Sequence, residues 1–372
     1  MPDIALSGLF GYTGTPVIFN TDLSFVKRSE TPDWKQNYQA NVVQPLYQGG
    51  RIRNNIKKSE IEALIAKLSL EENKSDLKLW LVSKYLDLFN LYKEEDVYRQ
   101  NIEEAKVRLH DIRKMMEQGM ITSNDVLRSE LTLTNYELSY RETNNDIQLV
   151  SQQLTIMLGM DESLLLEPDT TMLSDRMDIL SENDYVYQGY EKYPSIKISR
   201  ANKQLSDNNL NIIKADFLPN LSLQAGNTFQ RPIPNSSPVQ DLYINTWGVS
   251  LSLSYKLSSL FDRKHSISAA KHQIYIQDLA VEQEKQNVRT NVKSAYVKHK
   301  EALDRISSLE KSVIQAKENY RIVKNKYYNQ LAILTDLLDA NTVLLDAELQ
   351  LTKARTNAIY TYYQLQNASG NL

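Results

Sequence analysis

The chain has 372 residues, of which 41% are hydrophobic and 24% are charged, so it is long enough to bury a sizeable core. Its formal net charge of -3 argues against a nucleic-acid partner, because a surface that binds phosphates usually carries a basic excess. The lack of cysteine excludes disulfide frameworks, cysteine-ligated zinc and thiol catalysis, and no apolar run approaches the roughly 18 residues of a membrane-spanning helix.

The N-terminal stretch predicts two strands. Residues 3–14 alternate between two sets of side chains, which is the pattern of a strand. A polar stretch at about 20–33 follows. After it, Tyr38, Ala40 and Val42 alternate with polar neighbours and predict a second strand, which runs into the segment PLYQGGRIR. The very start of the chain lacks the basic residues and the apolar core of a signal peptide.

A long helical hairpin is predicted next. Residues 51–118 contain neither proline nor glycine, and their apolar side chains recur at spacings of three and four, which is a coiled-coil seam. At about 1.5 Å per residue this predicts a helix roughly 100 Å long, which Gly119 ends. Thr122 and Asp125 form a predicted capping box that starts a return helix, and the return helix ends at Gly159.

The second half begins after a polar connector at residues 160–182. Residues 183–217 predict a helix that breaks at Pro194, and residues 219–229 predict a strand. The strand after it, within TWGVSLSLSYKLS, alternates completely between an apolar and a polar face. Its apolar face contains Trp247, Val249, Leu251 and Leu253, and its polar face contains Ser250, Ser252 and Ser254.

This alternation has two interpretations. A soluble β-sandwich alternates in the same way. Strands of roughly 9 to 13 residues with aromatic ends, and serines where a water-exposed sheet would carry lysine, glutamate or threonine, are typical of a membrane barrel. In the barrel interpretation, Leu251 and its apolar neighbours face lipid, whereas the serines face the lumen.

The two halves match each other without a gap at an offset of 211 positions, which pairs Asp125 with Asp336. The second half therefore repeats the coiled-coil hairpin of the first. A period this long indicates a tandem duplication of one large unit rather than a stack of small repeats. We predict two structural repeats, residues 1–182 and 183–372.

The first repeat is shorter at its N-terminal end. Leu6 matches Leu223, but the helix predicted over 183–217 has no counterpart before Met1. We therefore expect the sequence to lack an N-terminal helix of about 35 residues and a signal peptide ahead of it.

No catalytic motif is found in the sequence. The four histidines, His110, His265, His272 and His299, form no H-E-x-x-H pair, and no nucleophile elbow, phosphate-binding loop or EF-hand spacing occurs. We expect the protein not to be an enzyme, and we expect no cofactor and no metal site.

Several of these features together resemble the TolC-type outer-membrane efflux channel family. They are the strand pair, the segment PLYQGGRIR before a long helix, the turn GMITSNDVL, and a return helix that ends in LTIMLG. The resemblance covers essentially the whole chain. It implies a mainly α mixed fold, in which long antiparallel coiled-coil hairpins build an α-barrel and four β-strands per chain contribute to a trimeric transmembrane β-barrel.

The resemblance also implies a function. The expected protein is a homotrimeric channel in the outer membrane of a Gram-negative bacterium, with a periplasmic extension. It would be the passive conduit from periplasm to exterior in a tripartite efflux or type I secretion system, with a periplasmic adaptor, an inner-membrane transporter and outer-membrane lipid as partners. The alternative is a soluble or peripheral coiled-coil scaffold with a small β-sandwich.

The resemblance assigns the pore constriction at the periplasmic mouth to Asp336, Asp339 and Tyr327. Carboxylates in the first turn of a helix also stabilise its N-terminus and need no further role. Tyr327 likewise occupies a seam position of the coiled coil.

The two hairpin tips differ from each other. The first tip, with Gly119 and Asp125, has the glycine of the family pattern. At the second tip, Gln330 replaces that glycine, and Ala332 stands where the family carries an arginine that ties the closed tip. Gating through that tie is therefore not expected in this chain.

Overall fold

A computed structural model describes residues 2–28, 31–169, 179–233 and 239–372. The chain forms two compact units, and each takes segments from both halves of the sequence. Unit 1 contains Met1–Ile65 and Arg200–Leu279, and unit 2 contains Ala66–Ser199 and Ala280–Leu372. The elements in chain order are β1 (Asp3–Tyr12), β2 (Val17–Phe19), β3 (Phe25–Arg28), β4 (Trp34–Gln48), α1 (Arg51–Glu117), α2 (Ser123–Leu158), α3 (Glu182–Lys192), α4 (Pro194–Ala215), β5 (Asn220–Arg231), β6 (Ile244–Ser254), α5 (Ser259–Tyr328) and α6 (Leu334–Ala368).

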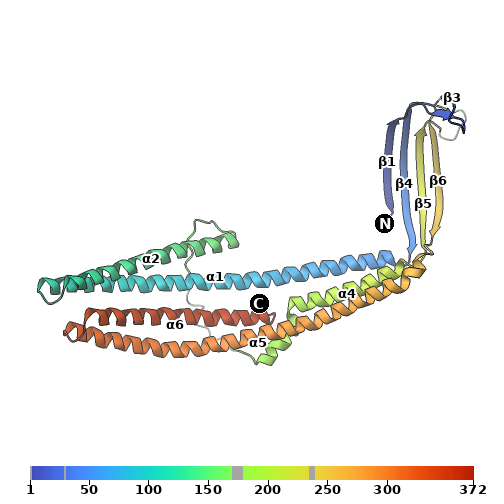
Figure 1. Cartoon of the computed structure of the whole chain (residues 1–372). Coiled ribbons are helices and arrows are strands. Elements are labelled where there is room, and N and C mark those ends of the chain that lie inside the picture. The colour runs from blue at the N-terminus through green and yellow to red at the C-terminus, as the bar shows by residue number, and fades with distance from the viewer. Residues whose placement is uncertain (1, 29–30, 170–178, 234–238) are drawn as a thin grey trace. The chain divides into compact units, whose positions relative to one another are not determined.

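Unit 1 contains a four-stranded antiparallel sheet in the order β1, β4, β5, β6 (Figure 1). The register pairs apolar residues with apolar residues and serines with serines. For example, Leu223 of β5 pairs with Leu251 of β6, and Ser222 pairs with Ser252. These four strands are the four that the sequence predicts. Together with the long helices, they confirm the predicted mainly α mixed fold.

A second, two-stranded sheet pairs β2 with β3. The strand β3 lies in the stretch at about 20–33 that the sequence marks only as polar. Strands of three and four residues are too short to display a period-2 pattern, so the alternation gives no signal there. The strands β2 and β3 lie in the connection between β1 and β4. At the base of this connection the backbone N–H of Thr13 donates to the Asp33 carbonyl at 2.7 Å.

The junction from β4 to α1 depends on two glycines. Gly49 and Gly50 have φ angles of +59° and +86°, a region that glycine adopts without steric cost. A Cβ on Gly49 would lie 2.9 Å from the Ala215 carbonyl oxygen and 2.9 Å from the Leu218 side chain. The close approach of this turn to the end of α4 therefore requires a residue without a side chain.

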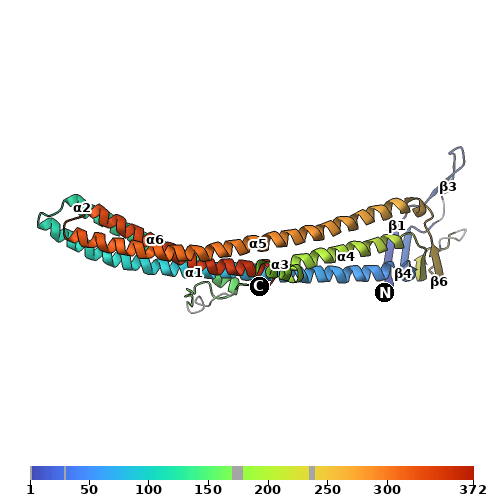
Figure 2. The same ribbon diagram turned by 90° about the horizontal axis from the view of Figure 1, so that it is seen from below.

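Unit 2 consists of helical hairpins. The helix α2 runs back along α1, and α6 runs back along α5 (Figures 1 and 2). Many of the apolar residues that recur at spacings of three and four are buried: Leu88, Ile102, Ala105, Leu109, Ile112, Val126, Ile147, Leu154, Leu337, Ala358 and Leu365. Two others that the same spacing places in the seam, Met116 and Leu303, are exposed at 37% and 43%. The coiled-coil interpretation of the apolar spacing is therefore confirmed.

The helix ends also follow the sequence signals. The backbone N–H of Thr122 donates to the Asp125 carboxylate at 3.1 Å, as expected of a capping box. Gly159 has a φ of +67° at the end of α2, which is the usual left-handed cap. The predicted break at Pro194 is the boundary between α3 and α4, since Pro194 opens α4.

Candidate functional site

The sheet has one apolar face and one polar face. Side chains alternate along β6, so Trp247, Val249, Leu251 and Leu253 lie on the face opposite to Ser250, Ser252 and Ser254. The pairing with β5 adds Leu221, Leu223 and Ala225 to the apolar face. The side chains of this face are not covered, and Trp247 and Leu251 are 78% and 63% exposed. An uncovered apolar sheet face of this kind requires an apolar environment or a partner.

Aromatic rings gather near one end of this sheet. The ring of Trp34 stacks on Phe10 at 4.9 Å and meets the edge of Tyr12 at 5.3 Å. The ring of Phe229 stacks on Tyr243, also at 4.9 Å. Aromatic rings at the ends of strands are typical of the interfacial girdle of an outer-membrane protein.

The first hairpin tip, at the left in Figure 1, is built as the sequence predicts. Gly119 has a φ of +76° and no atom within 4 Å of the position that a Cβ would take. Asp125 is half-buried and accepts a hydrogen bond from the Thr122 hydroxyl at 2.9 Å as well as the bond from the Thr122 backbone. Both residues therefore shape the turn and the start of α2.

The second hairpin tip presents two carboxylates. Asp336 lies in the first turn of α6 and accepts a hydrogen bond from the backbone N–H of Ile333 at 3.3 Å. Asp339 is one turn further along the same helix, and both side chains are exposed. Their spacing of three places them on one side of α6. Their assignment to a pore constriction stays a prediction, because the geometry of one chain does not test it.

Tyr327 lies inside the hairpin end rather than on its surface. It is 4% exposed and packs with Leu109, Ile112, Val126, Leu334 and Leu337. Ala332 packs against the same cluster. Burial raises the pKa of the Tyr327 phenol, with a further contribution from the Asp125 charge. The phenol therefore stays protonated, and its hydroxyl group has no hydrogen-bond partner in the described part of the chain.

The two hairpin tips are joined by contacts that the sequence pattern does not reveal. The Arg128 guanidinium of α2 donates to the Thr335 hydroxyl of α6 at 2.6 Å. The Gln330 amide lies 3.7 Å from the Met120 sulfur atom. Arg128 is the position that matches Asp339 at the offset of 211, but no spacing rule indicates that it reaches across to the other hairpin.

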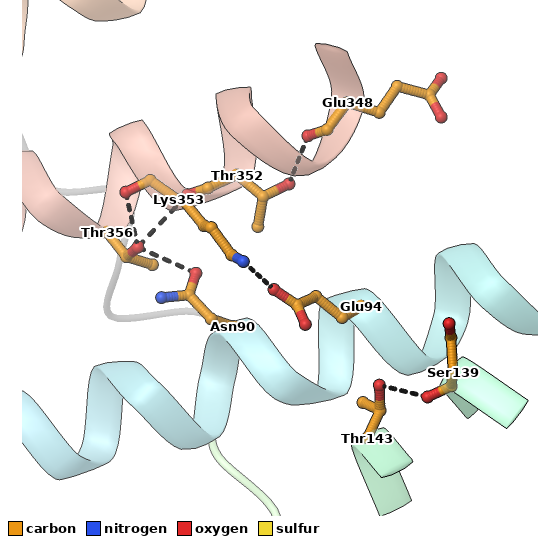
Figure 3. Close-up of polar contacts among 8 residues, drawn as sticks. All are labelled: Asn90, Glu94, Ser139, Thr143, Glu348, Thr352, Lys353 and Thr356. Atoms are coloured by element: carbon orange, nitrogen blue, oxygen red, sulfur yellow. Dashed lines mark hydrogen bonds and ion pairs between the residues drawn. The ribbon is translucent and has the colours of Figure 1, made fainter. Parts of the chain in front are cut away.

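A second set of polar contacts joins α6 to α1 further from the tips. Figure 3 shows the Lys353 ammonium of α6 against the Glu94 carboxylate of α1, at 2.6 Å, with the Glu94 side chain only 16% exposed. The Thr356 hydroxyl donates to the Asn90 side-chain oxygen at 2.9 Å (Figure 3). These contacts border a polar pocket of about 460 Å³. Asn90 and Glu94 are four residues apart on α1, and Lys353 and Thr356 are three residues apart on α6, so each pair lies on one side of its helix. Together they hold the second hairpin on the first.

Comparisons with known proteins identify the family. The family model described as outer membrane efflux protein matches residues 1–160 and 186–371. The chain belongs to the outer membrane efflux protein family. A search of curated protein sequences found no match.

Solved structures of similar fold are outer-membrane channels. The outer-membrane channel OprN has a TM-score of 0.77 and 17% identity, over 100% of this chain and 82% of its own. VceC from Vibrio cholerae has a TM-score of 0.76 and 16% identity, with 100% and 87% coverage. The CmeC channel of Campylobacter jejuni has a TM-score of 0.75 and 16% identity, with 100% and 78% coverage. At these identities the likeness shows the fold.

Membership in the outer membrane efflux protein family places the chain in the outer membrane as an efflux channel. Members of the family are trimeric channels that work with adaptor and transporter partners, and they are not enzymes. Within the described ranges, no group of three or more acidic or histidine side chains could hold a metal ion.

None of the described helices is both long enough and apolar enough to cross a membrane.

Residue 330, which matches Gly119 at the offset of 211, leads to a prediction about the stability of this efflux protein. Gln330 has a φ of +58°, which a residue with a side chain adopts only at a steric cost. Replacing it by glycine (Gln330→Gly) should raise the free energy of unfolding by about 0.5 to 1 kcal/mol. Glycine relieves the steric strain at this φ in the folded state, and this relief outweighs the larger conformational entropy that glycine gives the unfolded chain. The midpoint of urea unfolding of the purified chain in detergent measures this.

The matched control is the reverse change at the first tip, Gly119→Gln. No atom lies near the Cβ position of Gly119, so any loss there comes from backbone strain alone. It should lower the free energy of unfolding by about 1 kcal/mol. If Gln330→Gly lowered the stability while Gly119→Gln left it unchanged, the positive φ angle would not be the cause of strain at these two tips.

Proposed function

We propose that the chain forms a homotrimeric outer-membrane channel that acts as the passive conduit from periplasm to exterior in a tripartite efflux or type I secretion system. A periplasmic adaptor and an inner-membrane transporter would be its partners in that system. Because the conduit is passive, the energy for transport would come from the transporter.

The observation that carries this proposal is the sheet of unit 1. Its outer strands β1 and β6 each have one neighbouring strand among the described residues, so each leaves one edge unpaired. An unpaired edge cannot remain in a bilayer, and closing a barrel takes about eight strands or more. Copies of the chain around one axis would supply the missing neighbours. The apolar face would then meet outer-membrane lipid, and the polar face with Ser250, Ser252 and Ser254 would line the lumen.

The alternative of a soluble scaffold with a β-sandwich has less support. A sandwich buries the apolar faces of two sheets against each other. In this chain the apolar face of the described sheet is open, with Leu6 80% and Leu253 70% exposed. The other sheet consists only of β2 and β3, and it is too small to cover that face.

We also propose that residues 1–182 and 183–372 are two copies of one structural repeat. Positions 211 residues apart have similar backbone conformations: φ is +67° at Gly159 and +73° at Gly370. The return helices have nearly equal lengths, 36 residues for α2 and 35 for α6. Each repeat would thus contribute strands to the sheet and one long hairpin.

The mouth of the conduit would lie at the tip of the second hairpin. In a trimer, Asp336 and Asp339 would each occur three times around the axis, with Tyr327 packed behind them in the hairpin core. A ring of exposed carboxylates in a narrow opening attracts cations, because low-dielectric walls focus the field. The closed channel should therefore favour cations and be blocked by multivalent ones.

The test is the double variant Asp336→Ala and Asp339→Ala. It should abolish the block by a trivalent cation and weaken the cation selectivity. It should cost only about 0.3 to 1 kcal/mol per residue in stability, since both carboxylates are exposed helix-end groups. Planar-bilayer conductance, with and without the trivalent cation, measures the block and the selectivity.

The control is Asp125→Ala, the matching position on the first hairpin, which removes a capping carboxylate without touching the proposed mouth. It should leave the block in place. If instead the block survived in the double variant, Asp336 and Asp339 would be ordinary helix-end residues.

A further inference from the structure

Arg108 of α1 is a buried cation for which the described residues supply no ion-pair partner. The residue is 5% exposed, and its Nη2 atom is buried with no hydrogen-bond partner in the described part of the chain. No carboxylate of the described residues lies within ion-pair distance of its guanidinium. Arginine does not lose its proton in proteins, so this side chain remains charged. A buried charge without a partner is strongly destabilising, which indicates that something outside the chain compensates it.

The nearest carboxylates of the same helix have other donors. Glu104 and Asp111 occupy the positions four before and three after Arg108, where helical neighbours usually meet. Glu104 instead accepts from the Tyr320 hydroxyl at 3.2 Å, and Asp111 accepts from the Tyr328 hydroxyl at 3.3 Å. Both tyrosines belong to α5. Both carboxylates therefore lie against phenols of α5, and neither is within ion-pair distance of the Arg108 guanidinium.

Arg108 lines a pocket of about 260 Å³ between α1 and α5. Lys324 lines the same pocket, and its ammonium lies 5.6 Å from the centre of the Tyr320 ring, with no carboxylate in ion-pair range among the described residues. Glu103 and Glu104 also line it, but Glu103 is paired with Lys106 at 3.0 Å and Glu104 accepts from Tyr320. The two glutamates therefore each have a hydrogen-bond or ion-pair partner, whereas Arg108 and Lys324 have no carboxylate partner among the described residues.

A further donor lies close to Arg108. The Arg108 charge partly opposes the rise in the pKa of Tyr327 that burial causes, so the two groups are within electrostatic reach of each other. The Tyr327 hydroxyl group is buried without a hydrogen-bond partner in the part of the chain that the structure describes. Among the described residues, Arg108 and the Tyr327 hydroxyl group thus offer hydrogen-bond donors that no carboxylate satisfies.

We propose that the pocket between α1 and α5 binds a small monovalent inorganic anion of the halide class, held by Arg108 and Lys324. A halide accepts hydrogen bonds from several directions and needs no acceptor from the protein. The two glutamates that line the pocket repel a multivalent anion such as phosphate more strongly than a monovalent one, because the repulsion grows with the charge of the anion. The bound anion joins the first hairpin to the second near their tips, because its two cations belong to different hairpins.

The proposal is tested by a chloride titration of the purified chain in detergent. Thermal unfolding is followed at constant pH and ionic strength while methanesulfonate is replaced by chloride. The unfolding midpoint should rise with chloride and then level off, as for a ligand that binds only the folded state. The variant Arg108→Met keeps much of the side-chain length but loses the charge, and it should weaken the apparent chloride affinity by about tenfold or more.

Two controls keep the result interpretable. Arg113→Met removes an arginine of the same helix that is exposed and paired with Glu130, so the chloride dependence should persist. Crystals of the unaltered chain soaked in bromide should show an anomalous peak beside Arg108, which decides the matter even if Arg108→Met does not fold. An equal chloride response in the Arg108→Met variant, or no bromide peak at that side chain, would overturn the proposal. None of these measurements requires channel activity, so this proposal can fail while the proposed function stands.

Discussion

Replacing Leu251 by arginine should lower the free energy of unfolding by about 2 to 4 kcal/mol if the residue lies near the middle of the bilayer. Leu251 is on the apolar face of β6 and 63% exposed in the single chain. In the proposed barrel, an arginine there would place a charge in hydrocarbon. The free energy of unfolding of the chain inserted into lipid vesicles, measured by urea titration, gives the size of the effect.

The matched control is the adjacent change, Ser252→Arg, on the polar face of the same strand. Ser252 pairs with Ser222 on the polar face, and in the proposed barrel an arginine there would point into the water-filled lumen. Folding should be nearly unchanged, and only conduction should differ. Equal losses of stability for the two variants would rule out the assignment of one face to lipid and the other to water.

Truncating Leu337 to alanine should cost about 2 to 5 kcal/mol, the range for a fully buried leucine. Leu337 is 1% exposed and packs with Ile112 and Tyr327 in the core of the hairpin end. It is the residue directly after Asp336, so the change leaves both carboxylates of the proposed mouth in place while it loosens the helix that carries them. Hydrogen exchange of the amides in the first turns of α6 should become faster.

Leu331→Ala is the control for this change. Leu331 is at the same tip but 77% exposed, so its truncation should alter the stability by no more than about 0.5 kcal/mol. If both leucine variants behaved alike, the buried cluster would not be what holds the hairpin end together.

The fold could be predicted largely from the sequence, because most of its elements are long and periodic. The 67 residues of α1 repeat their apolar spacing many times, so the helix and its seam are determined by local pattern. Glycine and proline then mark the ends: Gly119 and Gly159 have positive φ angles, and Pro194 separates two helices. The strands β5 and β6 also show a local pattern, because apolar and polar side chains alternate over residues 220–225 and 247–254.

The contacts between the hairpins could not be predicted in this way. The bond from Arg128 to Thr335 joins residues 207 positions apart, and the pair of Glu94 and Lys353 joins different hairpins. No local spacing rule specifies such partners, since exposed charged residues are common on every helix. Arg108 is similar, because the sequence does not distinguish a buried arginine from the many exposed ones.

Tyr327 falls between these two cases. Its seam position indicates burial, and the structure places it in the hairpin core. The resemblance to the channel family instead implies a role at the mouth. A pore constriction would be formed by several copies of the chain. The local sequence around Tyr327 specifies its burial within one hairpin but not its position relative to the other copies.

The central claim, that copies of this chain form a passive conduit through the outer membrane, is tested most directly by conductance. The purified chain is added to a planar lipid bilayer with no nucleotide and no other protein present, and the ionic current is recorded under an applied voltage. We expect discrete conductance steps of one preferred size, with a current that favours cations. The same recording is made with the double variant Asp336→Ala and Asp339→Ala. If the inserted chain carried no current in either form, the claim would be contradicted.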